Sequence, residues 1–158
     1  MKIHTMLVGL LVAFTAAPAL GSEPVPYPQD YREWYHVKSM VISPGHPLAQ
    51  PFAGLHHIYA NGAAREGLKS GRFPTGAVLV FDLLEAVQAE HAIEEGKRKL
   101  IGVMVKDPQR YEATGGWGFE GFGEGQANLR LTKDGGRSCF QCHRQARDRD
   151  YVFSRLRD

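Results

Sequence analysis

The hydrophobic pattern of the chain has its strongest feature in the middle, where the segment "AVLVFDLLEAV" occupies residues 77–87. With the period of two that a strand requires, apolar residues fall on both of its faces. One face holds Ala77, Leu79, Phe81 and Leu83, and the other holds Val78, Val80 and Leu84. A strand that is apolar on both faces is buried on both sides. We therefore expect a hydrophobic core on one side and a helix or a second subunit on the other.

Weaker patterns around this strand predict further strands and a few short helices. Strands are predicted near 37–42, over 54–61 and over 99–107, and short helices within 27–36, 63–71 and 108–116. Residues 92–99, "AIEEGKRK", are expected to form an exposed connection. The Gly-rich residues 116–131 are expected to form irregular strand and loop. The fold class is therefore α+β, mainly an antiparallel β-sheet with a few short helices.

The N-terminal residues predict export. Lys2 is followed by the apolar run "MLVGLLVAF" and by small residues, which is typical of a secretory signal peptide over residues 1–21. Cleavage after Ala19 or after Gly21 fits equally well. The apolar run is shorter than the roughly 20 residues of a membrane-spanning helix, and no cysteine lies nearby to carry a lipid. We expect a periplasmic protein without a membrane anchor.

Residues 22–158 are predicted to form a single domain, because they contain no internal repeat and no low-complexity linker. The formal net charge of the whole chain is only +2, without a run of basic residues. A nucleic-acid partner is therefore not expected.

The two cysteines of the chain both lie in "CFQCH", residues 139–143, after the last predicted strand. A disulfide between them would close a very small loop and would constrain the unfolded chain little. A redox dithiol is expected at the front of a βαβ unit, and a structural zinc site needs a second pair of ligands. Neither context is present.

Covalent haem c is the interpretation that the motif favours. Two thiols separated by two residues can each add to one haem vinyl group, and the following histidine then binds the iron. We expect one covalent haem per chain, with Cys139 and Cys142 as thioether anchors and His143 as the iron ligand. No methionine follows His143, which argues against a small electron-transfer cytochrome c. The predicted strands argue against a four-helix cytochrome c′.

The mature chain resembles the cytochrome P-460 family, which includes the cytochromes c′-beta. The resemblance rests on the order of several segments: "YREW" at 31–34, "HIYAN" at 57–61, "GRFPTGAVLVFDLLEA" at 71–86, "VMVKD" at 103–107, "TGGWGFEGF" at 114–122, "CFQCH" at 139–143 and "DYVFSRLRD" at 150–158. In the hydroxylamine-oxidising branch a lysine of the long strand is cross-linked to the haem. Phe81 stands at that position here, and Lys69, Lys97 and Lys99 lie outside the strand.

The resemblance implies a role for two phenylalanines. In the c′-beta branch a pair of phenylalanines lies over the iron, and Phe52 and Phe81 match that pair. Apolar rings above a five-coordinate iron leave room for a small uncharged ligand such as nitric oxide. The strand pattern alone favours an ordinary core residue at position 81, and only the family resemblance favours a role over the iron.

Other residues have competing interpretations. His56 matches a distal arginine of the cross-linked branch, so it could donate to a bound ligand or titrate near neutral pH. Alternatively, it packs beside Tyr59 or is exposed on the sheet. Met40 and Met104 could bind iron, but their apolar surroundings favour core packing. Glu120 and Glu124 could accept protons in an oxidase, although acids in a Gly-rich loop are usually solvated.

The sequence thus predicts a periplasmic c-type haem protein whose open distal site binds nitric oxide or a similar small ligand. The alternative is a haem enzyme that oxidises hydroxylamine or nitric oxide and passes electrons to an external acceptor, a redox partner protein. The apolar second face of residues 77–84, together with the homodimers of the related family, predicts a homodimer.

Overall fold

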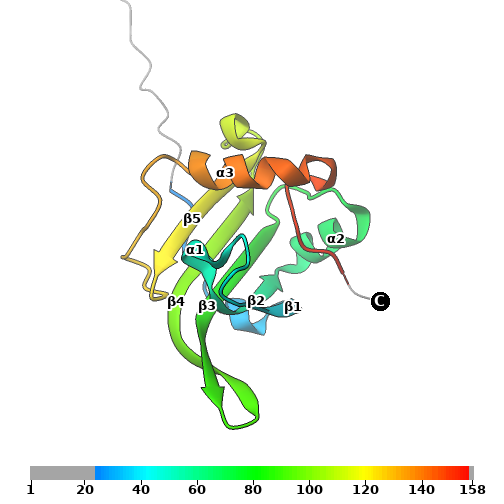
Figure 1. Cartoon of the computed structure of the whole chain (residues 1–158). Helices are drawn as coiled ribbons and strands as arrows, with labels where there is room; N and C mark the ends of the chain where they lie inside the picture. The colour runs from blue at the N-terminus through cyan, green and yellow to red at the C-terminus, as the bar shows by residue number, and fades with distance from the viewer. Residues whose placement is uncertain (1–23, 157–158) are drawn as a thin grey trace, which may run out of the picture.

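The computed structural model describes residues 24–156, so the predicted signal peptide lies outside the described residues. Within this range the chain forms one sheet of five strands in the order β1-β2-β3-β4-β5, and every neighbouring pair is antiparallel (Figure 1). The strands are β1 (Tyr35–Ile42), β2 (Gly54–Ala60), β3 (Val78–Ala89), β4 (Ala92–Lys106) and β5 (Trp117–Gly123). The α+β fold class, with a mainly antiparallel sheet and few short helices, is confirmed.

The helices are short. The α-helices are α1 (Ala49–Phe52), α2 (Gly62–Ser70) and α3 (Arg137–His143), and the 3-10 helices are η1 (Tyr31–Glu33), η2 (Glu112–Thr114) and η3 (Arg144–Arg149). Helix α2 begins where the side chain of Asn61 accepts a hydrogen bond from the Ala64 amide, and it ends at Gly71 in the left-handed conformation. Among residues 24–156 there is no helix with the length and apolar character needed to cross a membrane.

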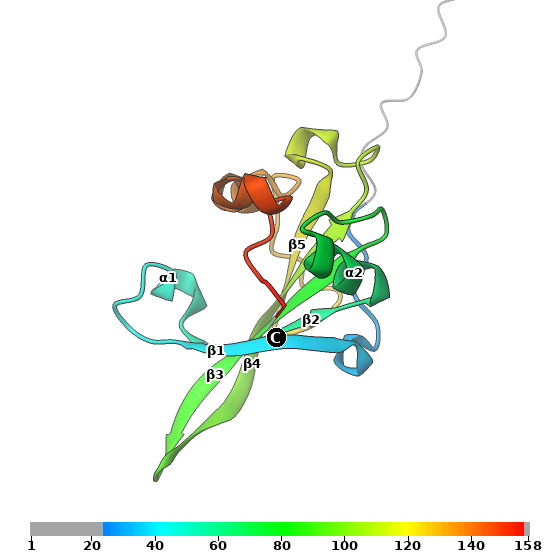
Figure 2. The same cartoon turned by 90° about the vertical axis from the view of Figure 1, so that its right-hand side faces the viewer.

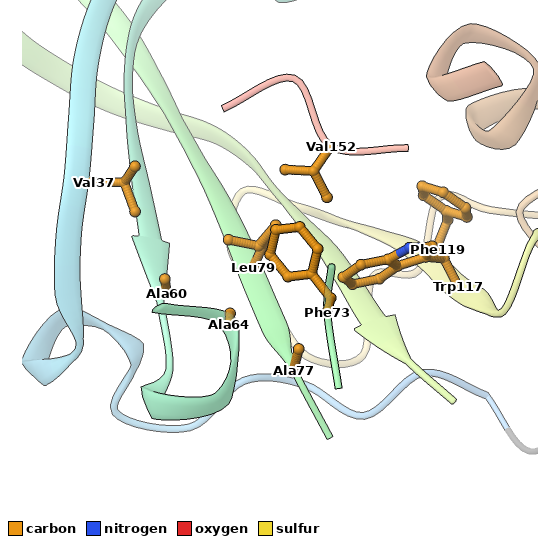
Figure 3. Close-up of a cluster of buried hydrophobic side chains, with 9 residues drawn as sticks. All are labelled: Val37, Ala60, Ala64, Phe73, Ala77, Leu79, Trp117, Phe119 and Val152. Atoms are coloured by element: carbon orange, nitrogen blue, oxygen red, sulfur yellow. The ribbon is translucent and has the colours of Figure 1, made fainter. Parts of the chain in front are cut away.

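Residues 78–84 of β3 are buried or half-buried on both faces, as their pattern predicts, whereas residues 85–88 are exposed. One face packs into a cluster with Phe73, Trp117, Phe119 and Val152, on the same side of the sheet as α1 and α3 (Figures 2 and 3). The other face packs against Val25 and Tyr31, which belong to the chain's own N-terminal segment. This segment therefore covers part of the face for which a helix or a second subunit was expected.

Two expectations about the middle of the chain are wrong. Residues 92–99 are not a connection but the first half of β4, where Ala92 pairs with Ala89 and Glu95 pairs with Ala86 in a long hairpin. The hairpin extends beyond the rest of the sheet, so its residues are mostly exposed (Figure 1). Residues 117–123 form a regular strand, β5, rather than an irregular one.

Candidate functional site

Helix α3 carries the cysteine motif and lies over the beginning of β5 (Figure 1). The side chain of Asp134 fixes the start of the helix by accepting hydrogen bonds from the amides of Gly136 and Ser138, at 3.0 and 2.8 Å. Phe140 packs against Phe119 of β5, with ring centroids 6.3 Å apart.

Neither thiol of the motif is in a disulfide. Cys139 is half-buried, whereas Cys142 is exposed. Burial raises the pKa of the Cys139 thiol, an effect that the hydrogen bond from Ser138 only partly offsets. Both sulfur atoms are therefore unpaired thiols, and Cys139 lies where the helix packs on the sheet.

His143 is held in one orientation. Its Nδ1 atom lies 2.8 Å from the carbonyl oxygen of Tyr151, and since a carbonyl only accepts, Nδ1 carries the proton. The lone pair is then on Nε2, which has no hydrogen bond among the described residues. Burial lowers the pKa of the imidazole, although the Tyr151 carbonyl opposes this. The rings of Phe119 and Phe153 flank it at centroid distances of 5.0 and 5.1 Å. A neutral imidazole with this tautomer is ready to bind a metal.

Three further predicted site residues lie together on the same side of the sheet as α3, but away from that helix. His56 of β2 packs on Phe81 of β3 with ring centroids 4.7 Å apart. The rings of Phe52, in α1, and Phe81 meet edge to face, with centroids 5.7 Å apart. Figure 2 shows α1 and α3 on the same side of the sheet, at different heights. The structure thus groups the residues predicted from the sequence into two sets, one on α3 and one around Phe81.

His56 is a buried histidine without a hydrogen bond among the described residues. Its exposed fraction is 3%, and its Nδ1 atom is buried with no partner. Burial, aided by the nearby charges of Lys38 and His57, lowers its pKa from 6.5 to about 4. The expectation that it titrates near neutral pH is therefore wrong. It lies beside Phe81 and not, as the alternative held, beside Tyr59.

A flat strip of backbone continues this surface. Phe81, Gly102 and Gly121 are in register across β3, β4 and β5, so a strip two strands wide has no side chain. A Cβ atom added at Gly102 would touch Phe81 alone, at 3.5 Å or more. Gly102 thereby leaves room for a flat group against β4, whereas the side chain of Leu131 already lies over Gly121, 3.3 Å from where a Cβ atom would be.

Large apolar side chains are exposed around the same strip. Leu129 and Leu131 lean toward Gly123 and Gly121, and their exposed fractions are 42% and 46%. Phe153, beside His143, is also 46% exposed. Apolar side chains gathered in this way indicate a surface that something else covers. No sequence pattern singled these three residues out.

The remaining candidates have structural roles. Trp117 is fully buried and donates from Nε1 to the carbonyl of Asp150 at 2.9 Å. Met104 packs at the edge of the Trp117 cluster. Glu120 is not solvated: it is 8% exposed and paired with Arg130 at 3.0 Å. Glu124 is exposed and accepts a hydrogen bond from Gln126.

Comparison with known protein families agrees with this geometry. The model of the family described as Cytochrome P460 matches residues 28–154. The chain belongs to the cytochrome P460 family. Membership implies a haem protein, so the group to be held here is haem iron. A search of curated proteins finds no match to this chain.

The residues present fit a haem in this family. The free Nε2 atom of His143 supplies a neutral nitrogen ligand, and two unpaired thiols lie in the same helix. The open backbone at Gly102 and the exposed apolar side chains of Leu129 and Leu131 suit a flat apolar macrocycle. Chemistry of the donors and shape of the sheet thus agree with the cofactor that the family implies.

Proposed function

We propose that this cytochrome P460 protein is a periplasmic c-type haem protein whose open distal site binds nitric oxide or a similar small ligand. When bound, the haem supplies an iron atom with a coordination position for a diatomic molecule. The observation that carries the proposal is the Phe52–Phe81 pair, which meets edge to face at 5.7 Å on the side of the sheet that α3 faces.

On the proximal side, Cys139 and Cys142 are the proposed thioether anchors. Each thiol adds its S–H across one haem vinyl group, so one C–S bond forms per cysteine and no oxidant is needed. The short spacing in α3 leaves His143 adjacent to the anchored ring. The carbonyl of Tyr151 accepts from its Nδ1–H and so leaves the lone pair on Nε2, which has no hydrogen-bond donor among the described residues.

On the distal side, the proposed task of the chain is to exclude water and large ligands. Phe52 and Phe81 present apolar ring surface, which offers no hydrogen bond to water. His56 behind Phe81 is neutral at physiological pH because burial lowers its pKa to about 4. It adds no positive charge to the site. This environment favours a small uncharged ligand over an anion.

A lysine-linked, hydroxylamine-oxidising enzyme is the less favoured alternative. The strand position proposed for the cross-linking lysine holds Phe81, which has no nucleophile. Lys99, on the neighbouring strand β4, has its amine engaged by the Ala53 carbonyl at 2.6 Å. Catalytic turnover would in addition need an external redox partner protein to take up electrons.

The absorption spectrum of the exported protein tests this proposal. We expect a Soret band that stays with the polypeptide after acid and organic extraction, and a resting ferric spectrum of the high-spin, five-coordinate type. Adding nitric oxide to the reduced protein should shift the band. A six-coordinate low-spin spectrum that nitric oxide leaves unchanged would contradict an open distal site. Brisk oxidation of hydroxylamine by the wild type would favour the enzyme.

We also propose that the protein is a homodimer. The family resemblance supports it, as do the exposed Val87 and Ile93 of the β3–β4 hairpin, which are 44% and 50% exposed. The chain's own N-terminal segment covers part of the second face of β3, so the hairpin is the better candidate for the contact. Sedimentation at micromolar concentration should give twice the chain mass, and a monomer would contradict the proposal.

A further inference from the structure

Phe52 is carried by a segment that has few connections to the sheet. Residues 43–53 join β1 to β2, and most of them are exposed. The backbone hydrogen bonds of this segment outside the strands are internal, such as Phe52 N to the Leu48 carbonyl at 3.1 Å. Among the described residues, its side-chain hydrogen bonds to other parts of the chain both come from Lys99. The position of Phe52 therefore depends on few contacts.

Lys99 is the extra residue of a β-bulge. Leu83 pairs with Leu100 and Leu84 pairs with Arg98, so Lys99 has no partner on β3. A bulge changes the direction of the side chains around it and is often found beside a functional site. Arg98 turns to the opposite face, where it binds Asp82, and Lys99 reaches the segment that carries Phe52.

The amine of Lys99 meets the backbone on both sides of Phe52. Its Nζ atom donates to the Ala53 carbonyl at 2.6 Å and makes a longer contact of 3.5 Å with the Pro51 carbonyl. Hydrogen bonds from a charged donor are stronger than neutral ones. The next residue, Gly54, lies so close to the Leu84 carbonyl that a Cβ atom would collide with it. The Lys99 amine and Gly54 together hold the backbone around Phe52 in place.

We propose that Lys99 is a positioning residue that holds Phe52 against Phe81 and thereby restricts the access of small ligands to the distal side. The inference rests on the proposed function, because it assigns a gate to the same distal site. Lys99 itself touches neither reacting atoms nor ligand. It acts through the carbonyls of Pro51 and Ala53, and the ring contact between Phe52 and Phe81 is the gate that it keeps closed.

The test is the binding of carbon monoxide to the reduced, haem-loaded protein and to three variants. Lys99→Met removes the charge and both contacts, Lys99→Arg keeps a cationic donor, and Lys97→Met removes a charge from an exposed lysine of the same strand. Losing a charged hydrogen bond changes an equilibrium by roughly ten- to a hundredfold. In Lys99→Met we therefore expect carbon monoxide to associate and to dissociate about tenfold faster or more, since one gate serves both directions. The other two variants should resemble the wild type.

A second measurement keeps the inference separate from the proposed function. Hydrogen exchange at the amides of Phe52 and Ala53, which bond within the segment, should accelerate in Lys99→Met and not in Lys97→Met. Unchanged rates of carbon monoxide binding in Lys99→Met, or equal acceleration in Lys97→Met, would overturn the gate. If the wild type bound no carbon monoxide, the proposed function would fail. Unchanged exchange at these amides would overturn the anchoring by Lys99.

Discussion

The two faces of β3 differ in how completely their side chains are buried and hydrogen-bonded by other parts of the chain. Phe81 and Asp82 are adjacent in sequence and point to opposite faces. Asp82 is fully buried and accepts from Tyr31 at 2.7 Å, Arg32 at 3.0 Å and Arg98 at 2.7 Å. Phe81 is only half-buried, beside Gly102, which leaves the backbone of β4 uncovered, and beside His56, which has no hydrogen bond among the described residues.

This difference indicates that the Asp82 face stabilises the fold and that the Phe81 face binds the cofactor. On the Asp82 side, which we call the closed face, the polar groups pair with one another: the carboxylate accepts from the two guanidinium groups and the tyrosine hydroxyl. The N-terminal segment packs over this face. On the Phe81 side, exposed leucines and an unsatisfied imidazole would be unfavourable in a face that had nothing to bind.

The largest effect is expected from removing the cofactor's anchors. Cys139→Ala together with Cys142→Ala should abolish covalent haem, because no other thiol exists in the chain. Staining of a denaturing gel for haem measures this. The double variant should still fold, since Cys139 and Cys142 are not paired with each other. Haem that stayed on the denatured polypeptide would contradict the assignment of both anchors.

The next largest effect is expected from a substitution of Asp82, on the closed face, and it is a loss of stability. Burial by itself would raise the pKa of Asp82, but hydrogen bonds from Arg98, Tyr31 and Arg32 outweigh it and lower the pKa below 3.8. Asp82→Asn should therefore cost about 3 kcal/mol of unfolding free energy at neutral pH, because it leaves the two arginines without their anion. This loss should disappear in strong acid, as the wild-type carboxylate is protonated at its lowered pKa.

Urea unfolding measures the loss of unfolding free energy in Asp82→Asn. The rate of ligand binding shows whether the substitution also affects the opposite face. Because Asp82 lies on the face away from Phe52 and His56, the rate of carbon monoxide binding should stay at the wild-type value. A variant as stable as the wild type would show that the Asp82 cluster does not stabilise the closed face.

Most of the fold follows from the sequence where apolar patterning is strong. The pattern of residues 77–84 predicts β3 and its two buried faces, and Asn61 and Gly71 define the ends of α2. The sequence does not predict a strand over residues 92–99, because these charged residues have no apolar alternation. Only their pairing with the end of β3 makes them a strand. The glycines of β5 suggested irregularity, yet Gly118 makes room for Tyr111 within a regular strand.

The sequence predicts only part of the candidate site. The "CFQCH" spacing is local, so Cys139, Cys142 and His143 needed no structure. Phe52 and Phe81 were identified through the family resemblance, and the structure brings their rings together. Lys99 could not be found in this way, because its role depends on a bulge and on a backbone segment 46 residues away.

Phe81→Ala should change ligand binding on the open face. If the ring hinders the ligand by about 2 to 3 kcal/mol, nitric oxide or carbon monoxide should bind up to about a hundredfold faster or more tightly. Flash photolysis of the reduced protein measures this. Leu79→Ala, on the same face but deep in the Trp117 cluster, is the control: it should lower stability without changing these rates. Unchanged ligand kinetics in Phe81→Ala, with a core-like loss of stability, would make Phe81 a packing residue.

His56 gives the smallest effect, which appears only in acid. The folded protein keeps this ring neutral down to about pH 4, whereas the unfolded chain takes up its proton near pH 6.5. Protons therefore bind preferentially to the unfolded state between these values, and the folded state loses stability as the pH falls through this window. For His56 alone the loss between pH 7 and pH 5 should be about 2 kcal/mol. Urea unfolding of His56→Leu should show a pH dependence reduced by that amount, while His46→Leu, which removes an exposed histidine, should keep the wild-type dependence. Equal pH dependence in both variants would contradict the lowered pKa of His56.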